Sequence, residues 1–222
     1  MFDGDDTVLV VGAHPDDEVL GAGGTMARHA EAGDEVHVLI VTEGTTQQYD
    51  DEDLIERKRR DARACAERLG VTDVHFGDLP DMRLDDVAHV EVNAVIEEVC
   101  EAVAPDVVYT HSRREVNRDH VAVHDSTLVA ARPGSGVSTL LGYETPSSTE
   151  WAPRTEGFEP DLFVDIDDHL EAKIEAFGDY ETEVREFPHP RSAEALRALA
   201  ETRGSACGSA AAEAFDVLRA YR

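Results

Sequence analysis

Short apolar segments that alternate with helical patterns constrain the fold of this chain more than any other feature. Each apolar segment is bounded by polar or glycine-rich turns, which is typical of a strand buried in a parallel sheet. Between these segments, apolar residues recur at helical spacing, and the helical patterns end at a glycine or just before a proline. We predict strands within residues 7–12, 35–44, 73–81 and 105–112, and helices over 19–32, 52–69 and 87–104.

This alternation predicts an α/β fold, a Rossmann-like, doubly wound and mostly parallel sheet flanked by helices. The C-terminal third is more elaborate, and there we predict an edge strand in "LLGYETP" (140–146), a strand in "DLFVDI" (161–166) and helices over 168–185 and 192–219. The chain has 222 residues and no internal repeat or linker. We therefore expect a single domain over residues 1–222.

The charge balance limits the partners of the protein. The chain carries 48 acidic residues against 20 lysines and arginines, a formal net charge of −28, and its only lysines are Lys58 and Lys173. Such a surface repels nucleic acid and anionic membranes. No apolar run is long enough for membrane insertion, and the N-terminus does not resemble a signal peptide. We expect a cytoplasmic, halophilic protein whose self-repulsion is screened by salt.

Two polar clusters follow the first and fourth predicted strands. The first is "HPDDE" at residues 14–18, and the second runs from His111 to His124. Ligands of doubly wound sheets bind beyond the carboxyl ends of the strands, so both clusters are expected to face one crevice. The acids of the first cluster could instead cap a helix. The glycines of "GAGGT" do not match the dinucleotide pattern GxGxxG, which disfavours a nucleotide-dependent enzyme.

The residue types in these clusters favour a hydrolytic zinc site. Such a site uses three protein ligands from His, Asp or Glu and leaves one position for water. His14 and Asp17 can face one ion from a tight turn, and His120 can complete the set. Asp16 is then a free carboxylate placed to act as general base. His124, four residues after His120, could be a fourth ligand or a hydrogen-bond partner of a ligand, although a histidine with neither role is the more common case.

The motifs together resemble those of the LmbE-like (PIG-L) N-acetyl-sugar deacetylases. The first motif is "AHPDDE" followed by glycines, and the second is "NRDH" at 117–120. Four further segments, the last of them near the C-terminus, are also similar to segments of the family. These segments are "RKRRDARACAERLGV" (57–71), "DLPDMRL" (78–84), "PDVVYTH" (105–111) and "RGSACGSAAAEAF" (203–215).

The resemblance implies roles for single residues. It implies His14, Asp17 and His120 as the metal ligands and Asp16 as the general base. Many members carry a histidine where this chain has Asn117, which can donate a hydrogen bond to an oxyanion but cannot shuttle a proton. Either Asp16 then makes both proton transfers, or another group such as His111 assists.

The resemblance also implies a substrate-contacting arginine, for which Arg57 and Arg59 are the candidates, and Trp151 is expected to offer a face to a sugar ring. The implied reaction is removal of an N-acetyl group from an amino sugar or sugar conjugate of the N-acetylglucosamine type. The implied cofactor is Zn²⁺ or another divalent metal. Family precedent suggests a homo-oligomer. The alternative is a non-catalytic metal- or sugar-binding module on the same fold.

Overall fold

A computed structural model describes residues 2, 4–45, 52–152 and 157–221. In this part of the chain one sheet holds seven strands in the order β3-β2-β1-β4-β5-β7-β6. Strands β1 to β5 run parallel, and β7 is antiparallel to both β5 and β6. The strands are β1 (Thr7–Gly12), β2 (Glu35–Thr42), β3 (Asp73–Leu79), β4 (Val107–His111), β5 (Thr139–Tyr143), β6 (Leu162–Asp165) and β7 (Ala212–Ala220). The predicted mostly parallel α/β fold is confirmed.

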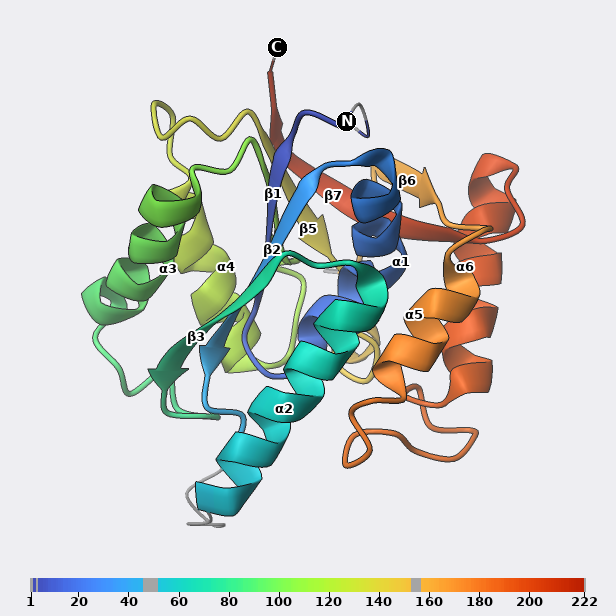
Figure 1. Cartoon of the computed structure of the whole chain (residues 1–222), viewed down its shortest axis with the longest axis horizontal. Helices are drawn as coiled ribbons and strands as arrows, with labels where there is room; N and C mark the ends of the chain where they lie inside the picture. The colour runs from blue at the N-terminus through green and yellow to red at the C-terminus, as the bar shows by residue number, and fades with distance from the viewer. Residues whose placement is uncertain (1, 3, 46–51, 153–156, 222) are drawn as a thin grey trace.

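Helices cover both faces of the sheet (Figure 1). One face carries α1 (Asp17–Ala32), α2 (Glu52–Leu69), α5 (Leu170–Phe177) and α6 (Ala193–Cys207), and the other carries α3 (His89–Val103) and α4 (Arg118–Ala130). Side chains of β1 alternate between the two cores: Val8 and Val10 pack under α1 and α2, whereas Leu9 and Val11 pack under α3 and α4. Both faces of the strand are therefore buried, which explains its continuous apolar run.

The C-terminal third departs from the prediction. The helix predicted over 192–219 ends at Cys207, because Gly208 turns the chain with φ 89°, and β7 follows. Alanine-rich sequence favours a helix, but Ala212 and Ala214 are buried and pair with β6, and the strand that they begin goes on to pair with β5, so tertiary packing overrides propensity. The strand predicted at the edge within 140–146 is interior, because β7 covers its outer side. The helix predicted over 168–185 ends at Phe177.

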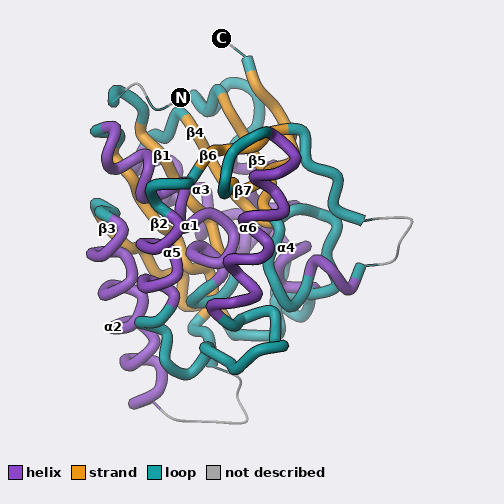
Figure 2. Tube along the Cα trace, turned by 90° about the vertical axis from the view of Figure 1, so that its right-hand side faces the viewer, coloured by secondary structure: helices purple, strands orange, loops and turns teal. Residues whose placement is uncertain are grey.

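The topology brings the two polar clusters together. β1 pairs with β4, with Val8 opposite Val107, so the loops that follow these strands leave the sheet side by side. The start of β1 and the end of β7 lie at the opposite end of the molecule (Figure 2). No helix of the described residues is long and apolar enough to cross a membrane.

Candidate active site

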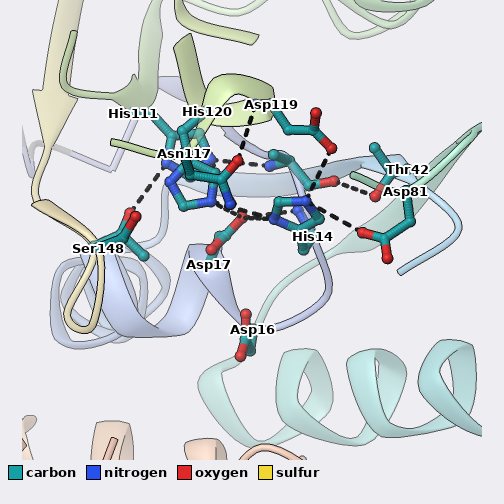
Figure 3. A network of polar contacts seen from close by, with 12 residues as sticks. His14, Asp16, Asp17, Thr42, Asp81, His111, Asn117, Asp119, His120 and Ser148 are labelled. Carbon is teal, nitrogen blue, oxygen red and sulfur yellow. Dashed lines mark hydrogen bonds and ion pairs between the residues drawn. The ribbon is translucent and has the colours of Figure 1, made fainter. Parts of the chain in front are cut away.

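The three predicted metal ligands meet at the carboxyl ends of β1 and β4. His14 lies in the turn after β1, Asp17 begins α1, and His120 lies in the first turn of α4. His14 Nδ1 lies 3.1 Å from Asp17 Oδ2 and 3.2 Å from His120 Nε2. The last contact, between His120 Nε2 and Asp17 Oδ2, is 3.4 Å. Figure 3 shows the three side chains pointing toward one another, so a single ion could contact all of them.

Each predicted ligand is held by the turn or helix start that carries it. Asp17 Oδ2 accepts a hydrogen bond from the backbone N–H of His14 at 2.8 Å, which closes the turn after β1. Asp16 has φ 120°, a conformation that residues with a side chain rarely adopt. Asn117 caps α4, because its Oδ1 accepts the N–H of Asp119 at 2.9 Å. The two loops therefore present their ligands from fixed positions.

The residues fit a divalent metal ion. Two imidazole nitrogens and a carboxylate are a common donor set of hydrolytic zinc sites. Asp17 Oδ1 is buried and has no hydrogen-bond partner among the described residues, so it is available to a cation. Burial lowers the pKa of His14, but hydrogen bonds to Asp119 and Asp17 outweigh this effect and raise the pKa to about 10. The carboxylates around His14 thus favour a positive charge at this position, which a metal ion would supply.

Carboxylates also lie at the outer nitrogens of both histidines. His14 Nε2 is 3.2 Å from Asp119 Oδ2 and 3.3 Å from Asp81 Oδ1, and His120 Nδ1 is 3.1 Å from Glu115 Oε2. Metal-ligating histidines commonly carry such a carboxylate, which orients the ring. His14, Asp81 and Asp119 form a second group with possible ligand atoms. The carboxylates on Nε2 leave Nδ1 of His14 for the ion, which favours the set with Asp17 and His120.

Asp16 pairs with an arginine that the sequence did not single out. Arg191 Nη1 lies 2.7 Å from Asp16 Oδ2 and 3.0 Å from Glu183 Oε2, and Arg191 Nε donates to Ser147 Oγ at 2.8 Å. Burial raises the pKa of Asp16 well above its usual range, and the Arg191 guanidinium opposes this shift. Figure 3 shows Asp16 apart from the three ligands, so it does not belong to the metal set. No motif marks Arg191 in the stretch "PHPRS", so no sequence signal could have found it.

His111, the candidate for assisting Asp16, and Asn117, the candidate oxyanion donor, differ in which of their polar atoms are free to bind a ligand. The buried His111 accepts a hydrogen bond at Nε2 from the N–H of Ala13 at 3.0 Å, so its Nδ1 carries the proton and lies 3.0 Å from Thr145 Oγ1. Burial lowers the pKa of His111 to about 4. Both ring nitrogens are therefore occupied, which disfavours a role in proton transfer. Asn117 uses its oxygen in the helix cap, so its Nδ2 is the end that can donate to a ligand.

The predicted substrate residues lie outside the metal group. Arg57 pairs with Glu181 at 2.8 Å, and Arg59 pairs with Glu56 and Asp78. The side chain of Trp151 is 62% exposed in a short 3-10 helix (Thr149–Trp151).

The residue of the basic run that reaches the Asp16 network is Lys58. Lys58 Nζ lies 2.7 Å from Glu183 Oε1, and Glu183 binds Arg191 through its other oxygen. The basic run was visible in the sequence, but its repeated charge did not show which side chain turns toward the site. The structure therefore adds Lys58 to the candidate residues beside Arg57 and Arg59.

Comparison with known families places these residues in context. Residues 9–131, which include all three predicted ligands, match the family model described as PIG-L, GlcNAc-PI de-N-acetylase. The chain is 30% identical over 178 residues to the uncharacterized deacetylase YaiS of Escherichia coli K12, covering 76% of this chain and 87% of YaiS.

Two further relatives carry different activities in their names. One is the diacetylchitobiose deacetylase of Thermococcus kodakarensis, 28% identical over 190 residues and covering 81% of this chain and 70% of that protein. The other is the 4-oxalmesaconate hydratase of Pseudomonas putida, 32% identical over 185 residues and covering 72% and 67%. The fold is shared with the conserved protein TT1542 of Thermus thermophilus, with a TM-score of 0.80, 23% identity and coverage of 98% and 97%.

Proposed function

The chain belongs to the PIG-L (LmbE-like) family, and from this premise we propose that it is a metal-dependent deacetylase acting on an N-acetylated amino sugar or sugar conjugate. The observation that carries the proposal is the convergence of His14, Asp17 and His120 with a non-ligating carboxylate, Asp16, directly beside them in the chain. A lone metal site would not need that carboxylate. A deacetylase needs it to move protons.

The proposed ion is Zn²⁺, held by His14, Asp17 and His120. When bound, it would supply a positive charge that polarises the acetyl carbonyl and makes nearby water more acidic. Asp119 and Glu115 would keep the two ligand rings in their orientations.

The proton transfers fall to Asp16. We infer that it takes a proton from the attacking water and later returns it to the leaving nitrogen, for which a raised pKa is suited. Arg191 holds the Asp16 carboxylate in place, and Lys58 and Glu183 in turn hold Arg191. Asn117 Nδ2 would donate to the oxygen on which negative charge develops.

The decisive experiment measures acetate and free amine released from N-acetylglucosamine conjugates by the zinc-loaded protein. We expect equal amounts of both products, loss of activity with a chelator and recovery with added zinc. Zinc binding at the three ligands without acetate release would favour the alternative, a non-catalytic metal- or sugar-binding module. Because one relative is a hydratase, the same sample is offered an unsaturated carboxylic acid, and hydration of that acid without acetate release would refute the proposal.

Three further expectations from the sequence stay proposals. The acidic composition supports a cytoplasm of high salt as the setting, and family precedent supports a homo-oligomer. Light scattering of the purified protein would test the oligomeric state. Arg57, Arg59 and Trp151 stay candidate substrate residues, together with Lys58. Substitution of each, read out as KM for the cleaved conjugate, would separate those that contact substrate from those that do not.

A further inference from the structure

Helix α1 is broken close to the site. Within Asp17–Ala32, Ala22 has φ −139° and ψ 18°, which is not helical. In an unbroken helix the N–H groups of Gly24 and Thr25 would donate to carbonyls one turn earlier, and the carbonyl of Leu20 would accept. All of these groups are buried, so each needs another partner.

Two buried side chains from distant elements supply those partners. Glu213 in β7 accepts hydrogen bonds from the N–H of Gly24 at 3.0 Å and of Thr25 at 2.7 Å. Lys173 in α5 donates to the carbonyl of Leu20 at 2.8 Å and pairs with Glu213 at 2.6 Å. The pair therefore joins the two halves of α1 across the break.

Close packing explains the glycines on either side of the break. A Cβ at Gly21 would lie 2.1 Å from the Tyr143 ring, and a Cβ at Gly24 would lie 2.7 Å from Ile166 Cδ1. Tyr143 is itself fixed, because its hydroxyl donates to the carbonyl of Val11 at 2.8 Å. The "GAGGT" motif thus lets α1 pass over fixed side chains at a distance that a continuous helix with larger residues could not reach.

We propose that Lys173 and Glu213 are positioning residues of the metal site. They hold residues 17–21 as a separate helical turn, and this turn carries the proposed ligand Asp17 and directly follows Asp16. Neither side chain is among the ligand groups, so both act through the turn. The inference rests on the proposed ligand set but not on the identity of the substrate.

The test uses a double variant, Lys173→Met with Glu213→Gln. Removing only one partner would leave a buried charge without its counterion, which is strongly destabilising. In the double variant no such charge is left. The carboxylate of Glu213 uses one oxygen for each backbone N–H, whereas glutamine replaces one of these oxygens by an NH2 group, which cannot accept. One amide at the break then loses its partner, and the turn with Asp17 is no longer fixed.

Zinc affinity by chelator competition is the main measurement, and the site is defined as the one lost in His120→Ala. We expect zinc to bind about 10- to 100-fold more weakly to the double variant, as for other residues that orient ligands. We also expect kcat to fall while KM stays within about threefold. If the double variant does not fold, Glu213→Asp is measured in the same way, because it keeps the charge pair but is one carbon too short to reach both backbone N–H groups.

The matched control is Arg203→Met with Glu144→Gln. This pair is also partly buried, with contacts of 2.7 Å, but its hydrogen bonds join α6 to the segment after β5 rather than to α1. The control is expected to lose stability and keep its zinc affinity. Unchanged zinc affinity in the double variant, or an equal loss in the control, would overturn the inference. Tight zinc binding without acetate release would overturn only the proposed deacetylase function, whereas wild-type protein without zinc affinity would overturn both.

Discussion

Replacement of Asp16 by asparagine separates the proposed base from the proposed ligands. Asp16 and Asp17 are adjacent, but only Asp17 lies in the group of possible metal ligands. Asparagine has nearly the same shape as aspartate and tolerates positive φ better than most residues, which matters because Asp16 has φ 120°. We therefore expect Asp16→Asn to fold, to bind zinc as the wild type does and to lose turnover.

The loss of turnover in Asp16→Asn should be much larger than the loss of stability. A general base contributes a factor of about 10² to 10⁴, which corresponds to about 3–5 kcal/mol in the activation barrier. The stability cost should be smaller. A hydrogen bond to a charged group contributes about 1.5–3 kcal/mol. Arg191 keeps its contacts to Glu183 and Ser147, and the variant no longer buries a carboxylate. We expect the free energy of unfolding to fall by less than about 2 kcal/mol.

Three measurements on one sample decide the outcome: bound zinc by elemental analysis, kcat from acetate release, and stability from urea unfolding. Asp17→Asn is the matched control, because it makes the same chemical change one residue later and should lose zinc. A kcat within tenfold of the wild type would refute the assignment of Asp16 as base. Loss of zinc from Asp16→Asn would show instead that this carboxylate holds the metal.

Three other predictions concern stability. Gly21→Ala should lower the free energy of unfolding by about 3 kcal/mol or more, since its Cβ would overlap the Tyr143 ring. Gly134→Ala, with open space around the added Cβ and φ 96°, should lower it by about 1–2 kcal/mol through the backbone conformation alone. Urea unfolding of both variants compares the two losses. Burial lowers the pKa of His29 below its usual 6.5, although Asp34 opposes the shift. As the pH falls below about 6.5, the unfolded chain binds this proton and the folded protein does not, so the free energy of unfolding should decline. Unfolding of His29→Gln over the same pH range should show a flatter decline. The net charge of −28 predicts a higher thermal midpoint in 2 M than in 0.1 M KCl, and equal midpoints would contradict the high-salt interpretation.

The part of the fold built from local patterns could be predicted, and the part built from long-range pairing could not. Strands β1 to β4 and the helices between them follow hydrophobic periodicity, and Gly33 ends α1 in the expected left-handed conformation. The failure at β7 has a physical cause. Alanine favours a helix in isolation, but residues 212–220 find backbone partners in β5 and β6, which are distant in the sequence. The local sequence of residues 212–220 does not indicate these partners.

The candidate site divides in the same way. One turn after β1 holds His14, Asp16 and Asp17, and His120 follows β4 in the chain. Because β1 and β4 are predicted to be neighbouring parallel strands, the meeting of these residues could be predicted from the topology. Arg191 reaches Asp16 from 175 positions away, in a segment without regular structure or motif. Its role depends on how the chain folds after β6. Sequence periodicity carries no information about that path.

The positions of the two lysines give an independent argument for the contacts among Lys58, Glu183 and Arg191 and for the Lys173–Glu213 pair. Lysine side chains usually lie at the surface of a protein. Both lysines of this chain are largely buried, since the side chain of Lys58 is 13% exposed and that of Lys173 is 6% exposed. At Lys173 one compact ammonium group meets a carbonyl and a carboxylate within 2.8 Å, a contact that the broader guanidinium of arginine would not make in the same space. The contacts of the Lys173 ammonium group therefore favour lysine at this buried position.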